Sequence, residues 1–396
     1  MKRHITGNVS WIGYIDWELK QFHGDDYAIQ HGSSQNAYVV EEEKTVLIDT
    51  VWAPHKEEYL DNLAREIDLS KADAVIANHG EPDHSSGLPD LMERLPEGTP
   101  IYCTANGVRS LKGQYGDRGW NFQVVKTGDR LDVGNGKELI FVEMRMLHWP
   151  DSMATYLTGD NILFSMDAFG QHYAVEELFA DRADEGILLG EAMKYYANIL
   201  NPFSPLVKAK LKEIGTLDLP FAMIAPSHGA IWRDHPEQII DLYAKWSDDF
   251  QEDQVTIVYD TMWGGTEKLA HALSVAVSEA SPDTKVKVFN INKTDKNTIA
   301  TEIFRSKAVA VGSPTVGQDI LSGMTGFLAF IRQLKFKKKK AGVFGTYGWS
   351  GESVAVLSRL LTDSGFTVVG DPVKVNWFPH QEALDELPAL AQAMLA

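Results

Sequence analysis

The chain has 396 residues, of which 44% are hydrophobic and 10% aromatic, and its formal net charge is −18. This length predicts two or three domains, each with enough apolar residues for a core. The balance of 37 basic against 55 acidic residues argues against binding to a nucleic-acid backbone. No window holds the roughly 18 uninterrupted apolar residues of a membrane helix, and no secretory apolar segment follows the N-terminus. We therefore expect a soluble cytoplasmic protein that contacts no membrane.

Cysteine and lysine usage adds two expectations. Cys103 is the only cysteine, which excludes an intrachain disulfide and a cysteine-based iron–sulfur or rubredoxin site in this sequence. A reducing compartment fits this composition. The one basic run, Lys337 to Lys340, precedes an apolar segment, and the pattern favours a solvated loop there.

Residues 1–252 have the pattern of two β-rich halves with helices between them. We expect strands at 9–14, 37–40, 45–48, 74–78, 101–103, 122–125, 139–142, 153–158, 162–164 and 221–225. Helices are expected at 55–67, at 185–211 with interruptions at Pro202 and Pro205, and at 236–250. This order predicts sheets with helices outside them, an α/β sandwich.

From residue 253 onward, strands and helices alternate strictly. A polar linker at 251–253 leads into strands expected at 255–259, 285–289, 308–311, 341–344 and 367–369. The helices between them are expected at 267–278, 297–306, 320–333 and 352–363. Alternation of this kind predicts a doubly wound parallel sheet with strand order 2-1-3-4-5. We accordingly assign one domain to residues 1–252 and a second to residues 253–396.

One stretch of the first domain concentrates polar groups that bind metals. Two imidazoles and two carboxylates follow the apolar run 74–77, on a turn with Gly80 and Pro82; they are His79, Glu81, Asp83 and His84. If the turn stays extended, positions 79, 81 and 83 point the same way. Buried carboxylates are costly unless a cation or hydrogen bonds compensate them, so this stretch predicts half of a metal site.

Three further candidate ligands stand where an apolar run gives way to a turn, namely His148, Asp167 and His228. In layered α/β domains such strand ends gather the functional loops. A single histidine at such a place is more often structural. All seven candidates share this kind of position, and the set therefore favours a metal centre.

The pattern His-x-Glu-x-Asp-His, followed by His148, Asp167 and His228, resembles the metallo-β-lactamase-like domain of flavodiiron proteins. Hydrolytic relatives of that fold carry His-x-His-x-Asp-His and bind zinc, whereas Glu81 replaces the second histidine here. Additional anionic oxygen ligands favour iron, whereas zinc binds well in a tetrahedral site of nitrogen ligands. The resemblance implies an αββα sandwich that holds two non-haem iron ions.

The resemblance also implies which residue serves which iron. One iron would be held by His79, Glu81 and His148, the other by Asp83, His84 and His228, with Asp167 as a bridge. In some members the residue matching His84 is not a direct ligand. His23, Tyr195 and Tyr196 are open to two interpretations, hydrogen-bond donors to the ligands or core residues. We expect no catalytic residue beyond the metal ligands.

Three loops of the second domain predict a flavin site. The turn before the helix at 267–278 is rich in hydroxyl groups and glycine, as a phosphate cradle is, but lacks the lysine of a Walker loop and the dinucleotide fingerprint. A monophosphate such as that of FMN suits it. Loops after the third and fourth strands meet it at the switch point. The candidate residues are Thr261, Met262, Trp263, Gly264, Gly265, Thr266, Ser313, Pro314, Thr315, Thr346, Tyr347, Gly348 and Trp349.

These loops resemble flavodoxin, and Gly-Trp-Ser-Gly-Glu at 348–352 is close to the flavodiiron pattern, so the resemblance covers nearly the whole chain. It implies an oxidoreductase that reduces O2 to water or NO to N2O, with FMN relaying electrons. With a single cysteine, we expect a core without a fused rubredoxin domain. The electron donor would be a separate protein such as rubredoxin, or reduced F420. A head-to-tail homodimer, or a dimer of such dimers, is also implied.

Two alternatives stay open at this point. One is a zinc hydrolase of the metallo-β-lactamase fold fused to a flavodoxin module, which Glu81 disfavours. The other is an electron carrier whose first domain is only structural, which the clustered ligand residues disfavour.

Overall fold

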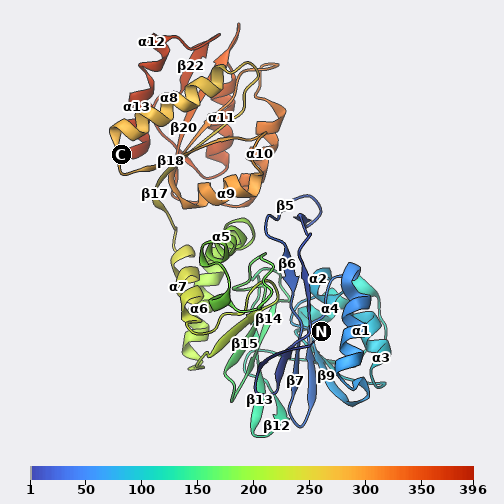
Figure 1. Ribbon diagram of the computed structural model, residues 1–396. Helices are drawn as coiled ribbons and strands as arrows, with labels where there is room; N and C mark the ends of the chain where they lie inside the picture. The colour runs from blue at the N-terminus through green and yellow to red at the C-terminus, as the bar shows by residue number, and fades with distance from the viewer. Residues whose placement is uncertain (1) are drawn as a thin grey trace. The chain divides into compact units, whose positions relative to one another are not determined.

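The computed structural model describes residues 2–396, and the chain divides into two compact units. The first unit contains the chain up to Tyr195 together with Phe203–Lys245, and the second contains Tyr196–Pro202 and Trp246–Ala396. Strand β17 (Glu252–Tyr259) begins inside the expected linker, so two of its three residues belong to a strand instead. Figure 1 shows both units with their elements labelled.

A seven-stranded sheet forms one half of the first unit. Its strands β7 and β8 make the predicted antiparallel hairpin, and β8 to β11 run parallel. In spatial order the strands are β1 (Arg3–Thr6), β2 (Val9–Trp11), β7 (Tyr38–Glu41), β8 (Thr45–Ile48), β9 (Ala72–Ile76), β10 (Ile101–Cys103) and β11 (Phe122–Val124).

A five-stranded sheet forms the other half, in the order β12 (Arg130–Gly134), β13 (Lys137–Glu143), β14 (Met153–Leu157), β15 (Ile162–Met166) and β16 (Met223–Pro226). Two short antiparallel pairs lie apart from both sheets: β3 (Tyr14–Asp16) with β6 (Ser33–Gln35), and β4 (Gln21–Phe22) with β5 (Tyr27–Ala28). The single strand predicted at 9–14 is therefore wrong, because β2 ends at Trp11 and Tyr14 pairs elsewhere.

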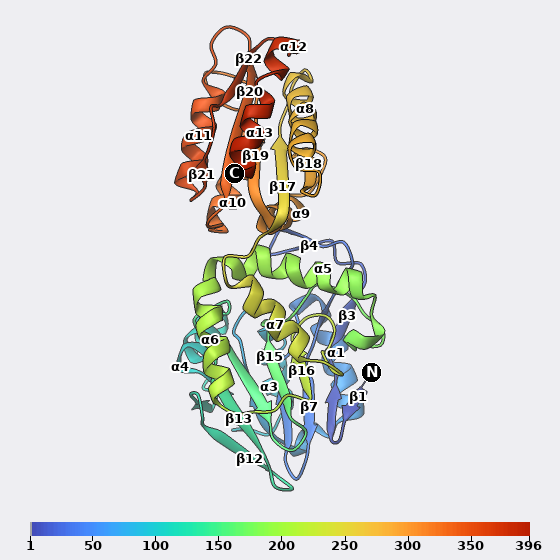
Figure 2. The ribbon, with the colours of Figure 1, turned by 90° about the vertical axis from the view of Figure 1, so that its left-hand side faces the viewer.

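Helices cover the outer face of each sheet of the first unit (Figure 1), and those over the five-stranded sheet face the viewer in Figure 2. Over the seven-stranded sheet lie α1 (Lys56–Glu66), α3 (Leu88–Arg94) and α4 (Ala105–Tyr115), whose apolar residues share one core with that sheet. Helices α6 (Ser204–Thr216) and α7 (Glu237–Trp246) cover β15. Helix α5 (Glu185–Tyr195) precedes them in the chain. The predicted helix at 185–211 is interrupted at Tyr196–Phe203 by π-helical and 3-10 turns.

The strand period explains why these layers stack. In β7, Tyr38 and Val40 enter the core between the two sheets, while Val39 faces the core under the helices. Successive side chains of a strand point to opposite faces, so one strand supplies both cores. Full burial of a side chain of this size contributes about 1.5–3 kcal/mol. The αββα arrangement expected from the family resemblance is confirmed.

The second unit is a parallel sheet in the order β18 (Lys285–Asn290), β17, β19 (Ser306–Gly312), β20 (Lys340–Tyr347) and β21 (Thr367–Val368), with β22 (Val373–Asn376) also paired to β20. The predicted 2-1-3-4-5 order is confirmed. Its helices are α8 (Gly265–Ala280), α9 (Lys296–Arg305), α10 (Ser322–Gln333), α11 (Ser353–Asp363), α12 (Gln381–Leu384) and α13 (Leu387–Leu395). The last two helices and β22 were not predicted.

The basic run is not the solvated loop that its composition suggested. Lys337 and Lys338 are exposed, but Lys339 is only 3% exposed and Lys340 begins β20. The ammonium of Lys339 donates to three backbone carbonyls, which explains how a lysine tolerates burial here.

Across residues 2–396, no helix is both long enough and apolar enough to cross a membrane.

Candidate functional site

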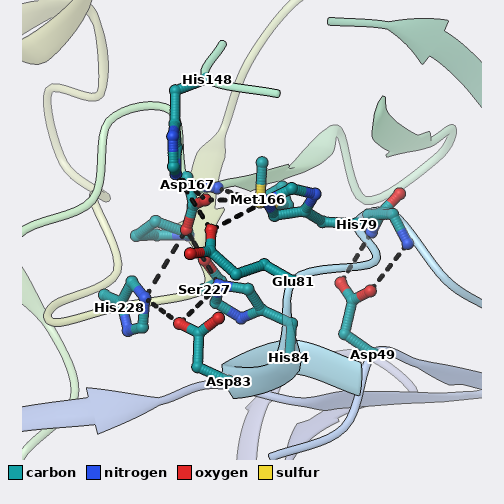
Figure 3. Close-up of polar contacts among 12 residues, drawn as sticks. Asp49, His79, Glu81, Asp83, His84, His148, Met166, Asp167, Ser227 and His228 are labelled. Carbon is teal, nitrogen blue, oxygen red and sulfur yellow. Dashed lines mark hydrogen bonds and ion pairs between the residues drawn. The ribbon is translucent and has the colours of Figure 1, made fainter. Parts of the chain in front are cut away.

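The seven candidate metal ligands lie together in the first unit (Figure 3). They come from four places in the chain, each beyond the end of a strand. The 79–84 stretch follows β9, His148 lies between β13 and β14, Asp167 follows β15, and His228 follows β16. Their side chains are buried or nearly so.

Local structure divides the 79–84 stretch into two parts. Glu81 has an extended backbone, and the short helix α2 (Pro82–Ser85) begins directly after it with proline at its first position. The turn is therefore not extended as far as position 83. The expectation that positions 79, 81 and 83 point the same way is wrong for position 83. Because Asp83 and His84 lie on this helical turn, they point to a different place from His79 and Glu81.

One group of ligand atoms gathers around Glu81. The Nε2 atoms of His79 and His148 each lie 3.2 Å from Oε2 of Glu81. Oδ2 of Asp167 lies 3.3 Å from Nε2 of His148 and 3.6 Å from Nε2 of His79. These four residues offer ligand atoms within 4.8 Å of one another, which is the geometry of a metal site.

A second group gathers around Asp83. Its Oδ2 lies 3.0 Å from Nε2 of both His84 and His228. The other oxygen of Asp167, Oδ1, lies 3.0 Å from Nε2 of His84 and 3.6 Å from Nε2 of His228. Asp167 thus turns one oxygen toward each group. The sorting matches what the family resemblance implied, and the role of each residue as an iron ligand stays a prediction.

The charges of these side chains perturb one another strongly. Burial opposes protonation of His79, but the nearby Asp151 and Glu81 carboxylates outweigh it and raise its pKa to about 10. Burial likewise opposes protonation of His148, yet Asp167 and Glu81 raise its pKa to about 9. Burial favours the neutral acid at Asp167, but His84 and His148 hold its pKa well below the usual range. A bound cation would replace these protons, so metal binding should release them.

Several of these polar atoms have no well-aligned hydrogen-bond partner among residues 2–396. They include Oδ1 of Asp83, Oδ2 of Asp167 and Nε2 of His84, all buried. Buried polar atoms are normally hydrogen-bonded, and imidazole nitrogens and carboxylate oxygens directed at a common point are metal donors. The residues therefore fit a pair of metal ions.

Hydrogen bonds behind the ligands fix their orientation. His228 donates from Nδ1 to the Ser34 carbonyl at 2.7 Å, which leaves Nε2 as the donor atom toward a metal. The Ser227 hydroxyl donates to Oδ1 of Asp167 at 2.9 Å. Asp49, buried beyond the end of β8, accepts hydrogen bonds from the backbone and side chain of Asn78, the residue before His79.

Sequence reasoning missed Asp49 and gave no role to Asp151. Asp49 follows an apolar strand as Asp167 does, so the same strand-end signal would have found it. Of the three residues that could be hydrogen-bond donors to the ligands or core residues, His23 has its Nε2 atom 3.4 Å from Oε1 of Glu81. The Tyr195 ring lies 6.4 Å from that of His228, whereas Tyr196 packs on Trp246 and Phe304 in the second unit.

A cavity of about 300 Å³ opens onto both metal groups. Glu81 of the first group and Asp83 of the second form part of its wall, together with the aromatic residues Phe22 and Trp52. The cavity is small and its walls are partly apolar, which suits a small neutral molecule better than a large charged one.

The second unit has a cavity of about 590 Å³ at the carboxyl edge of its sheet. Ten of the predicted flavin residues line it, namely Thr261, Met262, Trp263, Gly265, Pro314, Thr315, Thr346, Tyr347, Gly348 and Trp349. Six lining residues were missed by the sequence analysis: Val316, Gly317, Gln318, Ser350, Trp377 and Phe378.

The other three predicted residues support the cavity from behind. Gly264 precedes α8 with φ +81°, a left-handed conformation that favours glycine. The buried Thr266 hydroxyl lies 3.0 Å from that of Thr346, and the buried Ser313 hydroxyl accepts the Leu321 N–H at 3.2 Å.

The cavity fits a flavin mononucleotide. The N-terminus of α8 offers free N–H groups to a phosphate, and the exposed Trp263 and Trp349 (88% and 90%) offer aromatic faces to a planar ring. Its volume lies within the usual range for a ligand of this size.

Comparisons with known proteins match both units of the chain. A family model described as "ODP family beta lactamase" matches residues 33–229, and a flavodoxin model matches residues 257–388. An anaerobic nitric oxide reductase flavorubredoxin of Aliivibrio fischeri is 51% identical over 385 residues, which is 97% of this chain and 77% of that protein. The chain belongs to the flavodiiron protein family. An Escherichia coli flavorubredoxin is 50% identical over 96% of this chain and 79% of its own length.

Solved structures of other flavodiiron proteins have the same fold. The rubredoxin:oxygen oxidoreductase of Desulfovibrio gigas superposes with a TM-score of 0.95 at 35% identity, covering 100% of this chain and 98% of that one. The flavodiiron protein of Giardia intestinalis gives 0.92 at 30% identity, covering 99% and 96%. As a flavodiiron protein, this chain combines an FMN-binding flavodoxin domain with a domain for a non-haem diiron centre and is an oxidoreductase. This finding disfavours the zinc hydrolase and the simple electron carrier.

Proposed function

We propose that this flavodiiron protein reduces O2 to water, NO to N2O, or both, with electrons from an external donor. The observation that supports this most directly is the position of Asp167, whose two carboxylate oxygens face two separate groups of ligands. A carboxylate placed in this way suits a pair of metal ions that act on one substrate molecule.

The residues of the first unit would hold and orient the iron pair. His79, Glu81 and His148 would bind one iron, Asp83, His84 and His228 the other, and Asp167 both. Glu81 in place of a histidine favours iron over zinc at the first position. No catalytic residue beyond these ligands is proposed.

The residues of the second unit would bind FMN. The predicted set is Thr261, Met262, Trp263, Gly264, Gly265, Thr266, Ser313, Pro314, Thr315, Thr346, Tyr347, Gly348 and Trp349. FMN held there would supply uptake of electron pairs and release of single electrons, and iron ions held by the first unit would supply a place where the small oxidant is bound and reduced. The aromatic and carboxylate wall of the smaller cavity would admit that oxidant and exclude bulkier molecules.

The names of relatives support both substrates. The Aliivibrio fischeri protein is called a nitric oxide reductase, and the Desulfovibrio gigas protein an oxygen oxidoreductase. Because the curated relatives are flavorubredoxins, we propose rubredoxin, or a domain like it, as the electron donor, with reduced F420 as the alternative. We further propose that the protein works in the cytoplasm as a head-to-tail homodimer or a dimer of dimers, in which one subunit's flavin serves the partner's irons.

Replacement of Asp167 by alanine tests this function. We expect Asp167→Ala to lose bound iron, measured by elemental analysis, while it keeps its flavin spectrum. Anaerobic stopped-flow mixing of the reduced protein with O2 and with NO should then show oxidation by each gas slowed to the rate of free flavin. Asp61→Ala, on the exposed face of α1, serves as the control. Full iron occupancy in Asp167→Ala, or zinc alone in the wild type after growth with ample iron, would contradict the proposal.

A further inference from the structure

Trp377 lines the flavin cavity although it belongs to none of the predicted flavin loops. It directly follows β22, and its side chain is 64% exposed. Its ring centroid lies 6.3 Å from that of Trp349, with an angle of 60° between the two planes. Trp377 and Trp349 therefore form one aromatic corner of the cavity.

Three hydrogen bonds connect this region to the end of β20 and the loop after it, and the longest joins Nδ2 of Asn376 to the Tyr347 carbonyl at 3.4 Å. The Trp377 N–H donates to the Tyr347 carbonyl at 2.6 Å, and the Asn376 side chain donates from Nδ2 to the Gly348 carbonyl at 2.5 Å. Tyr347 and Asn376 are also paired in the β20–β22 ladder. Asn376 and Trp377 thus fix the direction of the Gly348 peptide.

The backbone of Trp377 is strained. Its φ is +58°, in the left-handed region that is unfavourable for a residue with a side chain. The indole also lies so close to Gly348 that a Cβ atom there would come within 3.0 Å of it. Strained residues persist where the surrounding structure holds them, and they cluster at ligand sites. A packing role alone does not explain a strained residue whose large side chain is mostly exposed.

We propose that Trp377 is a flavin-binding residue that contacts the isoalloxazine ring, and that Asn376 is a positioning residue that holds the Gly348 peptide against that ring. This inference rests on the proposed function, because it takes FMN as the ligand of the cavity. A planar aromatic ring packs well on an indole, and the corner formed by Trp377 and Trp349 offers two indoles. The phosphate would lie elsewhere, at the N-terminus of α8.

Binding of two flavins to the flavin-depleted protein separates the ring from the phosphate. Flavin fluorescence titrations would compare FMN with riboflavin, which lacks the phosphate. We expect Trp377→Ala to weaken both by about tenfold or more, since loss of one aromatic contact is worth on the order of 1.4 kcal/mol. Trp377→Phe should restore most of the affinity. Thr261→Val, at the phosphate end, should weaken FMN and leave riboflavin unchanged.

The flavin midpoint potential gives a second readout for the positioning role. Asn376→Ala should shift the potential, because alanine cannot donate a hydrogen bond to the Gly348 carbonyl. Phe330→Ala, a control on α10 outside the cavity, should leave the potential at the wild-type value. Wild-type affinity for both flavins in Trp377→Ala, together with an unchanged potential in Asn376→Ala, would overturn the inference. So would a loss of FMN binding in Trp377→Ala that spares riboflavin. Failure of the wild type itself to bind FMN would instead overturn the proposed function.

Discussion

Oδ1 of Asp151 lies 3.3 Å from Nδ1 of His79, while Nε2 of the same imidazole faces Glu81 and Asp167. Both side chains are fully buried. The other carboxylate oxygen of Asp151 accepts the Gly80 N–H at 2.8 Å. A carboxylate behind a metal-binding histidine orients its ring, so Asp151 places a negative charge behind His79 and holds the turn that follows it through the Gly80 N–H.

Replacement of Asp151 by asparagine should weaken the first metal position. The amide keeps the shape of the side chain but removes the charge behind His79, and loss of such a partner typically costs about 10–100-fold in metal affinity. Competition with a coloured chelator would measure the affinity, and Asp117→Asn, on an exposed loop, is the matched control. Iron affinity equal to that of the wild type would remove Asp151 from this role.

His84 should be a ligand of the second position. Its Nε2 lies 3.0 Å from Asp83 and from Asp167, and Nε2 of His228 lies 3.0 Å from the same oxygen of Asp83. His84→Ala should therefore reduce iron at the Asp83 group and preserve it at the Glu81 group. Stepwise iron titration of the metal-free variant should show one tight site and one weakened site. Two sites of wild-type affinity would show that His84 is not a ligand.

Stability of the second unit should rise with pH because of Lys339. Burial lowers the pKa of its amine from 10.5 to about 7, whereas the unfolded chain keeps the ordinary value. Between these two pKa values the unfolded state binds more protons than the folded state, so the free energy of unfolding increases with pH there. The contribution is fully present above pH 10.5 and is lost progressively as the pH falls from there to about 7.

Urea denaturation at several pH values would measure this effect. Lys339→Met removes the titrating group. The unfolding free energy of the wild type minus that of the variant should therefore increase as the pH rises from about 7 to 10.5. Lys337→Met, with an exposed side chain in the same run, should follow the wild type. Parallel pH profiles for Lys339→Met and wild type would contradict the prediction.

Cys103 should not react with alkylating reagents in the folded protein. It is fully buried in β10, and burial raises the pKa of its thiol to about 12. The thiolate is the reactive form, and neither it nor a path for the reagent is present in the native state. Mass spectrometry after iodoacetamide treatment should find Cys103 modified only when the protein is denatured first. Rapid modification of the native protein would contradict this expectation.

Local sequence patterns predicted the strands that position the sites. The hairpin of β7 and β8 and the parallel order of the second sheet follow from apolar periodicity and short connections, which act over a few residues. The same patterns failed where tertiary contacts decide. The composition of the basic run predicted a solvated Lys339, but the fold places the carbonyls of Phe250, Phe304 and Ser306 around its side chain.

The sequence by itself determined which candidate metal ligands stand at strand ends and which loops suit a flavin. The period and the end of a strand are local properties, so one stretch of sequence is enough to predict them. Only the tertiary structure decided how the ligands divide, with Asp167 between two groups and Asp151 behind His79. Only it brought Trp377 beside Trp349. These relations join residues far apart in the chain, and their distances depend on how sheets and loops pack, which no local pattern specifies.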